Sequence, residues 1–328
     1  MQTSRRRFIA RLPGAAAALS LATPWTGTFG FDGKPVRLVI PFPAGGITDA
    51  LGRRLAESLR DIWSTPVVVE NRPGGSGIVA AVAVKGAPPD GRTWFMGHLG
   101  SHAANATLLK VLPYDPVADF TPIGLVGDSV FMIMVNSSLR ARSLAEFIAY
   151  AKANPGKLNF ASVGNGSASH LFLEMFQQRT GISITNVPFK GSAQAFPELL
   201  AGRIDGYMGP PLGLTEFLKS GQLRGLAVLA NSRLKGQEDV PTTQEAGLPD
   251  FTPTSWLGLL AAGNVPADRR DAMSKDLQTV VRSPTFTQWC EERYLVPRPS
   301  TGPEFARFME RETASWRQVI STAKITVD

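Results

Sequence analysis

Short apolar runs alternate with amphipathic stretches from residue 34 onward. The apolar runs have the length of strands, and the stretches between them repeat their apolar positions at helical spacing. The pattern predicts strands at 36–40, 67–70, 93–96, 123–126, 131–135, 158–161, 184–187, 205–208, 224–229 and 256–261. It predicts helices at 47–60, 76–85, 143–153, 169–179, 192–201 and 213–219. This alternation favours an α/β protein with parallel sheets covered by helices on both faces.

Polar and glycine-rich positions mark several ends of these elements. Ser143 stands before the 144–153 stretch with Glu146 three places on, which is the pattern of a capping box. Asn154-Pro155-Gly156 ends that stretch. Earlier in the chain, residues 71–77 form a turn that leads into the helix predicted at 76–85.

The pattern changes after residue 256, where one more apolar run is followed by helical segments near 266–282, 284–293 and 303–322. We expect this tail to pack back on the N-terminal half. The prediction is a first lobe made of 34–128 plus 251–328 and a second lobe made of 129–250. A ligand would lie in the cleft between them, since α/β sheets bind ligands at the carboxyl ends of their strands.

Composition agrees with a folded globular protein, since 43% of residues are hydrophobic and 19% are charged. The formal net charge is +7, but residues 1–22 contain four arginines and no acidic residue, so it falls to +3 without them. No basic stripe with interleaved aromatic residues remains, which argues against a nucleic-acid partner.

The first 22 residues have the pattern of an export signal. Arg5-Arg6-Arg7-Phe8 precedes an alanine-rich apolar stretch, and Ser20-Leu21-Ala22 offers small residues for cleavage near Ala22. The paired arginines indicate the twin-arginine route, with an ordinary Sec signal as the alternative. The apolar stretch is too short to span a membrane. These features predict a periplasmic protein.

The stretch PFPAGGITD, residues 41–49, follows the first strand and opens the first helix. Its adjacent glycines do not match a GxGxxG motif, and no P-loop lysine follows. Backbone N–H groups of Gly45 and Gly46 at a helix N-terminus could bind an anion, with Asp49 capping the helix and holding the loop. The alternative is a plain strand-to-helix turn.

A second glycine-rich loop, residues 162–170, also follows a strand and opens a helix, so it is a second candidate anion site. It does not match the G-x-S-x-G motif of serine hydrolases, which argues against Ser167 or Ser169 as a nucleophile. Residues 188–192 form a third loop of this kind. Lys190 there either points a charge toward the cleft or is simply solvated.

The chain offers no convincing metal site and implies no cofactor. His98 and His102 are four residues apart, but Gly100 lies between them and no third ligand is near. A hydrogen-bonding role in a loop fits them better. The single cysteine, Cys290, can form no internal disulfide and is expected to be a buried thiol.

Many segments, in order, resemble the Bordetella uptake gene (Bug) family, the substrate-binding proteins of tripartite tricarboxylate transporters. They include PFPAGGITDALGRRLAE, VVVENRPGGSG, LPYDPVADFTPIGLV, NPGKLNFASVGNGSASHL, VPFKGSAQAFPELLAGRIDGY and VPTTQEAGLPDF. The resemblance covers nearly all of residues 35–322. It implies an α/β, two-lobe periplasmic binding protein fold of type II, which closes on a small ligand in the cleft.

The resemblance also implies a ligand site. The first loop would bind one carboxylate, partly through ordered waters, and the second would lie opposite. Ser101 and Pro210 lie in segments, 97–105 and 209–212, that depart from the usual family pattern and border the expected ligand. The implied ligand-binding residues are Phe42, Ala44, Gly45, Gly46, Asp49, Ser101, Ser162, Gly164, Gly166, Ser167, His170, Lys190, Gly191, Asp205 and Pro210.

The function implied is that of a periplasmic receptor without catalytic activity. It would capture a di- or tricarboxylate, an amino acid or an aromatic acid and deliver it to two membrane subunits, acting as a monomer. Two alternatives stay open: a ligand sensor for a signalling system and a periplasmic hydrolase.

Overall fold

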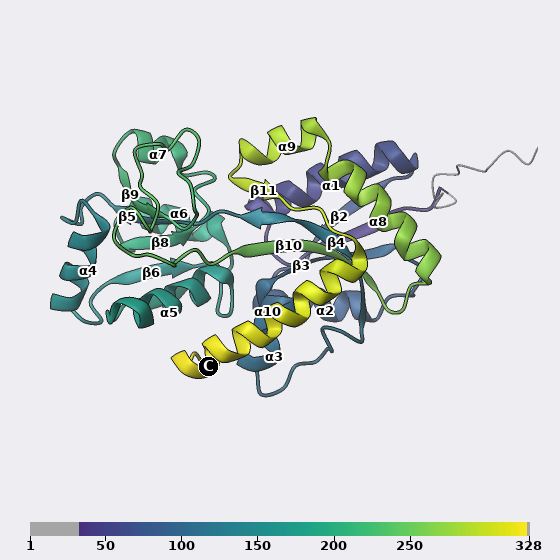
Figure 1. Ribbon diagram of the computed structural model, residues 1–328, viewed down its shortest axis with the longest axis horizontal. Helices are drawn as coiled ribbons and strands as arrows, with labels where there is room; N and C mark the ends of the chain where they lie inside the picture. Colours follow the sequence, from purple (N-terminus) through teal and green to yellow (C-terminus); the bar gives the residue numbers. More distant parts are fainter. Residues whose placement is uncertain (1–32, 327–328) are drawn as a thin grey trace, which may run out of the picture.

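The computed structural model describes residues 33–326, which form two α/β lobes side by side (Figure 1). The first lobe contains a six-stranded sheet of order β11-β4-β10-β3-β1-β2. Its strands are β1 (Val36–Ile40), β2 (Val67–Asn71), β3 (Thr93–His98), β4 (Phe120–Ser129), β10 (Ser255–Ala262) and β11 (Leu295–Pro297).

The second lobe contains a five-stranded sheet of order β7-β6-β8-β5-β9. Its strands are β5 (Met132–Asn136), β6 (Asn159–Ser162), β7 (Thr185–Pro188), β8 (Gly206–Gly209) and β9 (Leu223–Val228). The sequence therefore predicted the two-lobe α/β class correctly.

Helices cover both sheets. In the first lobe these are α1 (Ile47–Trp63), α2 (Ile78–Lys85), α3 (Asn105–Leu108), α8 (Ala267–Val281), α9 (Pro284–Glu291) and α10 (Gly302–Ala323), with short turns η1 (Gly75–Gly77) and η2 (Gly100–Ala104). In the second lobe they are α4 (Leu144–Ala153), α5 (Ala168–Thr180), α6 (Ser192–Leu200) and α7 (Thr215–Lys219).

The prediction of parallel sheets was wrong in one respect, because both sheets are mixed. β1 runs parallel to β2 and β3, but β10 runs antiparallel to β3 and β4. In the second sheet β5 is antiparallel to β8 and β9. β10 and β5 each enter their sheet from the other lobe, so they arrive without the crossover helix that makes neighbouring strands parallel. β11 also pairs antiparallel with β4, but it follows α9 of the same lobe.

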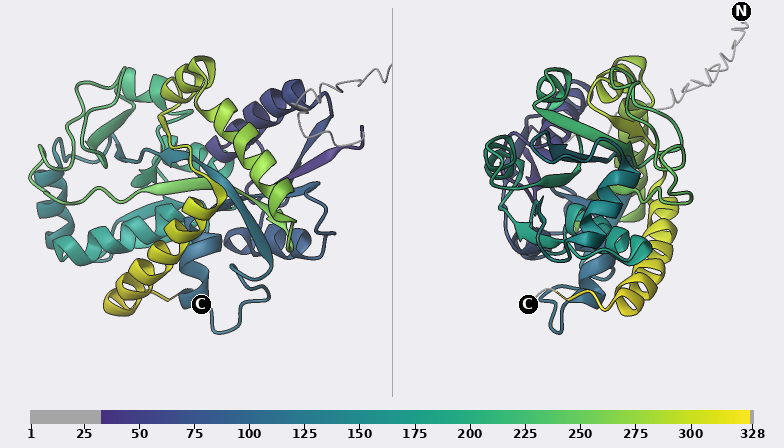
Figure 2. Two further views of the ribbon diagram at one scale, coloured as in Figure 1. Left: turned by 45° about the vertical axis from the view of Figure 1, so that its right-hand side comes forward. Right: turned by 90° about the vertical axis from the view of Figure 1, so that its left-hand side faces the viewer.

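Two long strands join the lobes. β4 ends at Ser129 and β5 begins at Met132, so the chain passes into the second lobe almost without a turn. β10 brings it back, pairing with β4 from Ser255 opposite Ser129 to Ala262 opposite Phe120 (Figures 1 and 2). These two paired strands therefore carry the chain from the first lobe to the second and back.

The C-terminal helix α10 packs on both lobes. It lies along β4 and η2 of the first lobe, and farther on it contacts α5 of the second (Figure 1). There the rings of Trp316 and Phe172 stack with their centroids 6.0 Å apart. Of the three C-terminal helices, α8 contacts α1 and β4, α9 contacts β11, and α10 contacts both lobes.

Some local details differ from the sequence-based expectations. The turn η2 with α3, and the short strand β11, were not predicted, because their apolar runs are too short to show a period. At α4 the side chain of Ser143 accepts the N–H of Glu146, but the Glu146 carboxylate accepts the N–H of Arg142, so the capping box is incomplete. A complete box occurs instead at Thr301 and Glu304 of α10.

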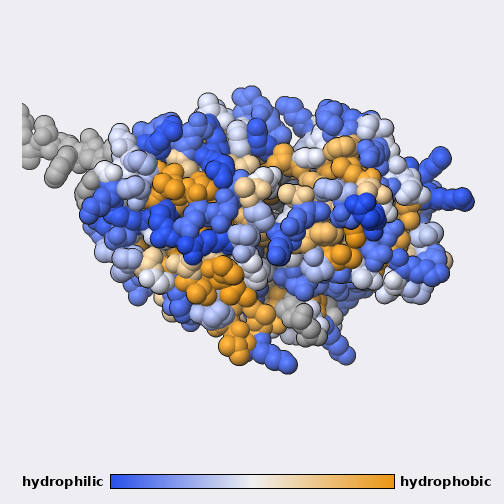
Figure 3. Space-filling model, turned by 180° about the vertical axis from the view of Figure 1, so that it is seen from behind, coloured by the Kyte–Doolittle hydropathy of each residue, from blue (hydrophilic) through white to orange (hydrophobic). Residues whose placement is uncertain are grey.

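The surface mixes polar and apolar residues. Seen from behind, hydrophobic residues form small groups separated by hydrophilic ones (Figure 3). Within residues 33–326 no helix has the length and apolar character needed to cross a membrane. The predicted export signal and its cleavage near Ala22 lie outside the described residues.

Candidate functional site

A cavity of about 80 Å³ lies between the two lobes, and residues of both line it. That volume has room for several water-sized groups. Its lining residues are Phe42, Pro43, Ala44, Gly46, Ile47, Thr48, His98, Ser129, Phe131, Val163, Ser167, Ala168, Ser169, Gly191, Ser192, Ala193, Phe196, Tyr207, Pro210, Leu212, Ser255 and Leu257.

Three helices begin at the cavity wall. Gly46 is the N-cap of α1 in the first lobe, and Ser167 and Gly191 are the N-caps of α5 and α6 in the second. All three N-caps line the cavity together with the first-turn residues that follow them. First-turn N–H groups have no acceptor within their own helix, and each helix start carries partial positive charge. The cavity therefore favours an anionic group approached from both lobes.

The first of these loops is held by Asp49. Its carboxylate accepts hydrogen bonds from Gly45 N (3.0 Å), Arg53 Nε (3.0 Å) and Asn71 Nδ2 (2.8 Å). Asn71 Nδ2 also donates to the carbonyl of Phe42 at 3.0 Å. Asp49 is buried and lies in the first turn of α1, so it binds backward to the loop and does not serve as the N-cap. Asp49 therefore holds the conformation of the loop without lining the cavity itself.

Several interactions affect the pKa of Asp49. Burial acts to raise it, but the hydrogen bonds from Arg53, Gly45 and Asn71 outweigh burial and hold it below its usual value. The carboxylate is therefore ionised at neutral pH and keeps its three donors.

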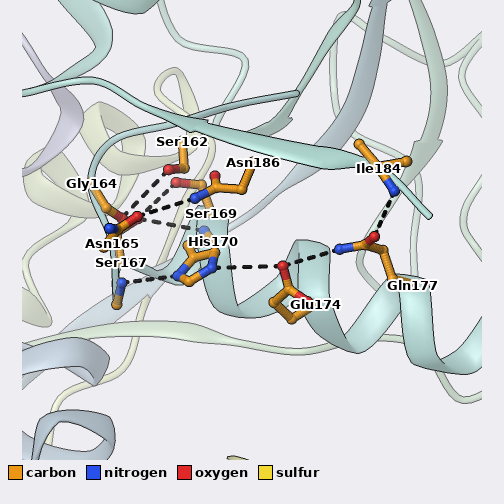
Figure 4. Close-up of polar contacts among 11 residues, drawn as sticks. Ser162, Gly164, Asn165, Ser167, Ser169, His170, Glu174, Gln177, Ile184 and Asn186 are labelled. Atoms are coloured by element: carbon orange, nitrogen blue, oxygen red, sulfur yellow. Dashed lines mark hydrogen bonds and ion pairs between the residues drawn. The ribbon is translucent and has the colours of Figure 1, made fainter. Parts of the chain in front are cut away.

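The second loop is fixed by side chains of α5 (Figure 4). The Ser167 hydroxyl donates to the carbonyl of Gly164 at 2.6 Å and lies 3.0 Å from the Ser169 hydroxyl. Ser169 Oγ accepts the N–H of Val163 at 3.0 Å. Because these serines bind the loop backbone, they set the path of residues 163–167 around the start of α5.

His170 supports the same loop from the helix side. Its Nδ1 accepts the N–H of Gly166 at 3.0 Å, so the proton is on Nε2, which lies 3.6 Å from Glu174 Oε1 (Figure 4). Burial lowers the pKa of His170 to about 4. The ring is therefore neutral at pH 7 and acts as a hydrogen-bond acceptor for the loop.

The two strands that join the lobes form the floor of the cavity. Ser129 of β4 lies opposite Ser255 of β10, and Leu257 lies opposite His98 of β3. All four line the cavity. Neither serine was predicted to be a site residue, because residues 129 and 255 are brought together only by the antiparallel pairing of distant strands.

The rest of the lining is mostly apolar. Phe42, Phe131, Phe196 and Tyr207 contribute rings, and burial raises the pKa of the Tyr207 hydroxyl above its usual value. Among the described residues that line the cavity, none carries an acidic or a basic side chain other than the neutral His98. Charge on a ligand would therefore be balanced by backbone dipoles.

The cavity brings together six of the residues implied by sequence: Phe42, Ala44, Gly46, Ser167, Gly191 and Pro210. The others do not line it. They are Gly45, Asp49, Ser101, Ser162, Gly164, Gly166, His170, Lys190 and Asp205.

The reasons for these placements are local. Ser101 is buried, and its hydroxyl donates to the His98 carbonyl and lies 2.9 Å from His102 Nδ1. Lys190 is exposed. Asp205 precedes β8 and accepts the N–H of Asn159 at 2.7 Å, where β6 begins. The cavity lies at the opposite, carboxyl end of these two parallel strands.

Ser167 is not arranged as a nucleophile. Ser167 Oγ is committed to the Gly164 carbonyl, and the nearest ring nitrogen on its helix, His170 Nδ1, already accepts a backbone N–H. Within residues 33–326, no group of three or more His, Cys, Asp or Glu side chains is arranged to hold a metal ion.

Comparison with known families matches residues 51–325 to the model for the "Tripartite tricarboxylate transporter family receptor". Among similar proteins, BugT of Bordetella pertussis is 31% identical over 308 residues, which is 94% of this chain and 92% of BugT. A protein of Agrobacterium vitis is 32% identical, covering 85% of this chain and 79% of that protein.

Solved structures share the fold over nearly the whole chain. The R. palustris protein Rpa4515 with adipate is 33% identical with a TM-score of 0.86, covering 90% of this chain and 99% of that one. MatC from Rhodopseudomonas palustris with bound malate is 29% identical with a TM-score of 0.82, covering 88% and 100%. The periplasmic binding protein BugD is 30% identical with a TM-score of 0.83, covering 89% and 98%.

Proposed function

The chain belongs to the tripartite tricarboxylate transporter receptor family, and on that premise we propose that it binds a small carboxylate in the cavity between its lobes. It is a periplasmic solute-binding receptor and not an enzyme. The bound acid would then be delivered to the membrane subunits of a transporter.

The convergence of three helix N-termini on one cavity carries this proposal. The starts of α1, α5 and α6 offer N–H donors from both lobes, and among the described residues that line the cavity none has a cationic side chain that competes for the anion. A carboxylate fits this set, because charge-assisted hydrogen bonds from backbone N–H groups stabilise an ionised oxygen. Closure of the lobes would complete the set of donors.

We propose that the ligand contacts come in two groups. Phe42, Ala44, Gly46, Ser167, Gly191 and Pro210 would touch the ligand directly, since they line the cavity. Gly45, Asp49, Ser162, Gly164, Gly166 and His170 would act behind them by fixing the two loops. Ser101, Lys190 and Asp205 are proposed to have no contact with the ligand.

The chemistry of the ligand follows from relatives and from the lining. Rpa4515 was solved with adipate and MatC with malate, both small dicarboxylates. The apolar lining here suits a carboxylate with an aliphatic or aromatic body. A free amino acid fits less well, because among the described lining residues there is no acidic side chain to balance an ammonium group.

Assembly and export complete the proposal. We propose that 34–128 with 251–328 and 129–250 are the two lobes, that the receptor is a monomer, and that its partners are two membrane subunits. A twin-arginine signal, or a Sec signal, would direct it to the periplasm with cleavage near Ala22.

One alternative keeps the same binding chemistry: the receptor could present its ligand to a signalling system instead of a transporter. Growth of a deletion strain on single carbon sources separates the two. Loss of growth on the bound acid with normal growth on others supports uptake, and normal growth with lost gene induction supports signalling.

The binding step itself is tested by a thermal-shift screen of the mature protein with mono- and dicarboxylates and amino acids. A ligand that binds only the folded state raises the melting temperature by mass action. A rise that increases with the concentration of a carboxylate supports the proposal. No rise with any carboxylate at millimolar concentration contradicts it.

A further inference from the structure

The C-terminal helix α10 contributes to a hydrophobic core that the two lobes share. Its buried apolar side chains belong to one cluster that also contains core residues of both lobes, such as Phe95 of β3 and Phe160 of β6. The α10 members of this cluster are Phe305, Phe308, Met309, Trp316 and Ile320. The lobes are therefore joined through packed side chains along α10, as well as through the strands β4 and β10.

The first part of α10 is fixed to these two strands. Trp256 Nε1 of β10 donates to Glu312 Oε2 at 3.2 Å, and the Trp256 ring packs edge-on against Phe308 with centroids 5.7 Å apart. Trp256 pairs with Asp128 of β4, whose carboxylate accepts Arg298 Nη1 at 2.9 Å. The guanidinium group of Arg298 lies 4.3 Å from the centre of the Phe308 ring. This part of the helix therefore follows the strands that pass between the lobes.

The next turn of α10 reaches the second lobe through a row of aromatic rings. Trp316 stacks on Phe172 of α5 with centroids 6.0 Å apart and an angle of 18° between the rings. Phe172 packs edge-on against Phe131 at 4.8 Å, and Phe131 lines the cavity between the lobes. Trp316 is 6% exposed and Phe172 is fully buried. Trp316 is thus connected to the cavity wall without lining the cavity itself.

We propose that α10 is a third connection between the lobes and that Trp316 is a positioning residue, which acts through Phe172 to hold the second lobe and Phe131 in the ligand-binding arrangement. Coupling of this kind is carried by contiguous packed side chains that a domain motion has to rearrange. Because α10 is fixed to β4 and β10 and Phe172 belongs to the second lobe, a rotation of the lobes about these strands has to change the stack.

The stack occurs together with close approach of the lobes. Pro43 of the first lobe and Gly191 of the second lie side by side in the same structure. An interaction made in one arrangement and altered in another shifts the population toward the first. The stack therefore favours the arrangement in which the lobes are close. The effect on affinity rests on the proposed function, whereas the effect on the lobes does not.

Three variants test this role. Trp316→Leu removes the ring and keeps an apolar side chain, while Trp316→Phe retains a ring that can stack. The matched control is Trp289→Leu, because the ring contacts of Trp289, with Phe286 and Arg293, lie within the first lobe. Both leucine variants should lower the melting temperature, so stability alone does not distinguish them.

The arrangement of the lobes is measured without ligand by pulsed electron paramagnetic resonance. Spin labels are attached to Arg60→Cys in α1 and Lys152→Cys in α4, two exposed positions in different lobes. The native Cys290 is buried, which protects it from the label. Trp316→Leu should broaden the distance distribution, Trp316→Phe should stay close to wild type, and Trp289→Leu should leave it unchanged. A wild-type distribution in Trp316→Leu would overturn the inference.

Calorimetry with adipate and with malate measures the effect on binding. Loss of one aromatic pair between the lobes should weaken binding to Trp316→Leu by about 2- to 10-fold. Trp316→Phe should lose less, and Trp289→Leu should bind as the wild type does. Equal losses in Trp316→Leu and Trp289→Leu would overturn the inference, because lost stability would then explain both.

The two measurements separate this inference from the proposed function. If neither acid binds the wild-type protein, the result counts against the proposed function, and the distance distributions still decide whether α10 connects the lobes. If an acid binds and the distribution of Trp316→Leu changes while its affinity stays at the wild-type value, the positioning role of Trp316 is overturned.

Discussion

Gly191 of the second lobe faces Pro43 of the first so closely that a Cβ on Gly191 would lie 2.9 Å from Pro43 Cγ. Both residues line the cavity. The contact joins the N-cap of α6 to the loop before α1, so the closeness of the lobes depends on the absence of a side chain here.

Gly191→Ala should therefore hinder closure. The added methyl group meets a proline ring that cannot bend away, so the lobes would have to stay slightly apart. We expect ligand affinity to fall about tenfold or more. The positive φ of 157° at Gly191 should also strain an alanine and lower the melting temperature of the ligand-free protein. Calorimetry and small-angle X-ray scattering with and without ligand measure both effects. Unchanged affinity with normal compaction would show that the lobes do not need this contact.

Gly46→Val should abolish binding. Gly46 lines the cavity at the start of α1, and its backbone φ of −84° accepts any L-residue, so the fold should tolerate the change. The side chain would occupy the space next to the first-turn N–H groups. The control is Gly86→Val, an exposed position at the end of α2 with φ of −80°. If calorimetry shows wild-type affinity in Gly46→Val, the start of α1 does not contribute to ligand binding.

Asp49→Ala tests the support of the first loop. The change leaves Gly45 N and Asn71 Nδ2 without an acceptor, so we expect a loss of about 1–3 kcal/mol in the free energy of unfolding and weaker ligand binding. Arg53→Ala removes the exposed partner of the same ion pair, whose side chain is 54% accessible, and should cost much less. Urea denaturation compares the two variants. If both variants lose the same free energy of unfolding, Asp49 contributes through its ion pair with Arg53 and not through its hydrogen bonds to the loop.

Much of this site could be predicted from sequence, because its loops are local features. Gly45, Gly46 and Gly191 lie a few residues after a strand and directly before a helical pattern, so a short stretch of sequence is enough to place them at helix starts. The helices α1 and α6 begin where the pattern predicted.

The floor of the cavity was not predictable in the same way. Ser129 and Ser255 are separated by more than a hundred residues, and only the antiparallel pairing of β4 with β10 makes them neighbours. His98 and His102 look equivalent in sequence, yet an irregular turn, η2, sends one ring to the cavity and the other into the core. Neither result follows from hydrophobic periodicity, which does not encode strand pairing or irregular turns.

Histidine burial predicts how stability depends on pH. His98, His102 and His170 have folded-state pKa values of about 3, 3 and 4, below the ordinary value of 6.5. Between these values the unfolded chain binds more protons than the folded protein, so stability falls as pH decreases from about 6.5 toward 4. Above pH 6.5 the histidines make no pH-dependent contribution.

Urea denaturation at pH 7, 6, 5 and 4 measures this trend. The interval from 6.5 to 5 is the most informative, because carboxylates with ordinary pKa values titrate below it. Burial raises the pKa values of Asp128, Glu174, Asp276 and Glu312, and these groups oppose the histidine trend, so the comparison of variant with wild type is the decisive one. His102→Gln should flatten the slope in that interval, since it removes one of the three groups. A slope in His102→Gln equal to that of the wild-type protein would contradict the neutral, buried state of this ring.

The central claim is that a carboxylate binds at helix N-termini supplied by both lobes. A crystal structure of the mature protein with the acid that gives the largest thermal shift tests it most directly. We expect carboxylate oxygens within hydrogen-bonding distance, directly or through one water, of first-turn N–H groups of α1 and of α5 or α6. A carboxylate held instead by a basic side chain, or bound outside the cavity, would contradict it.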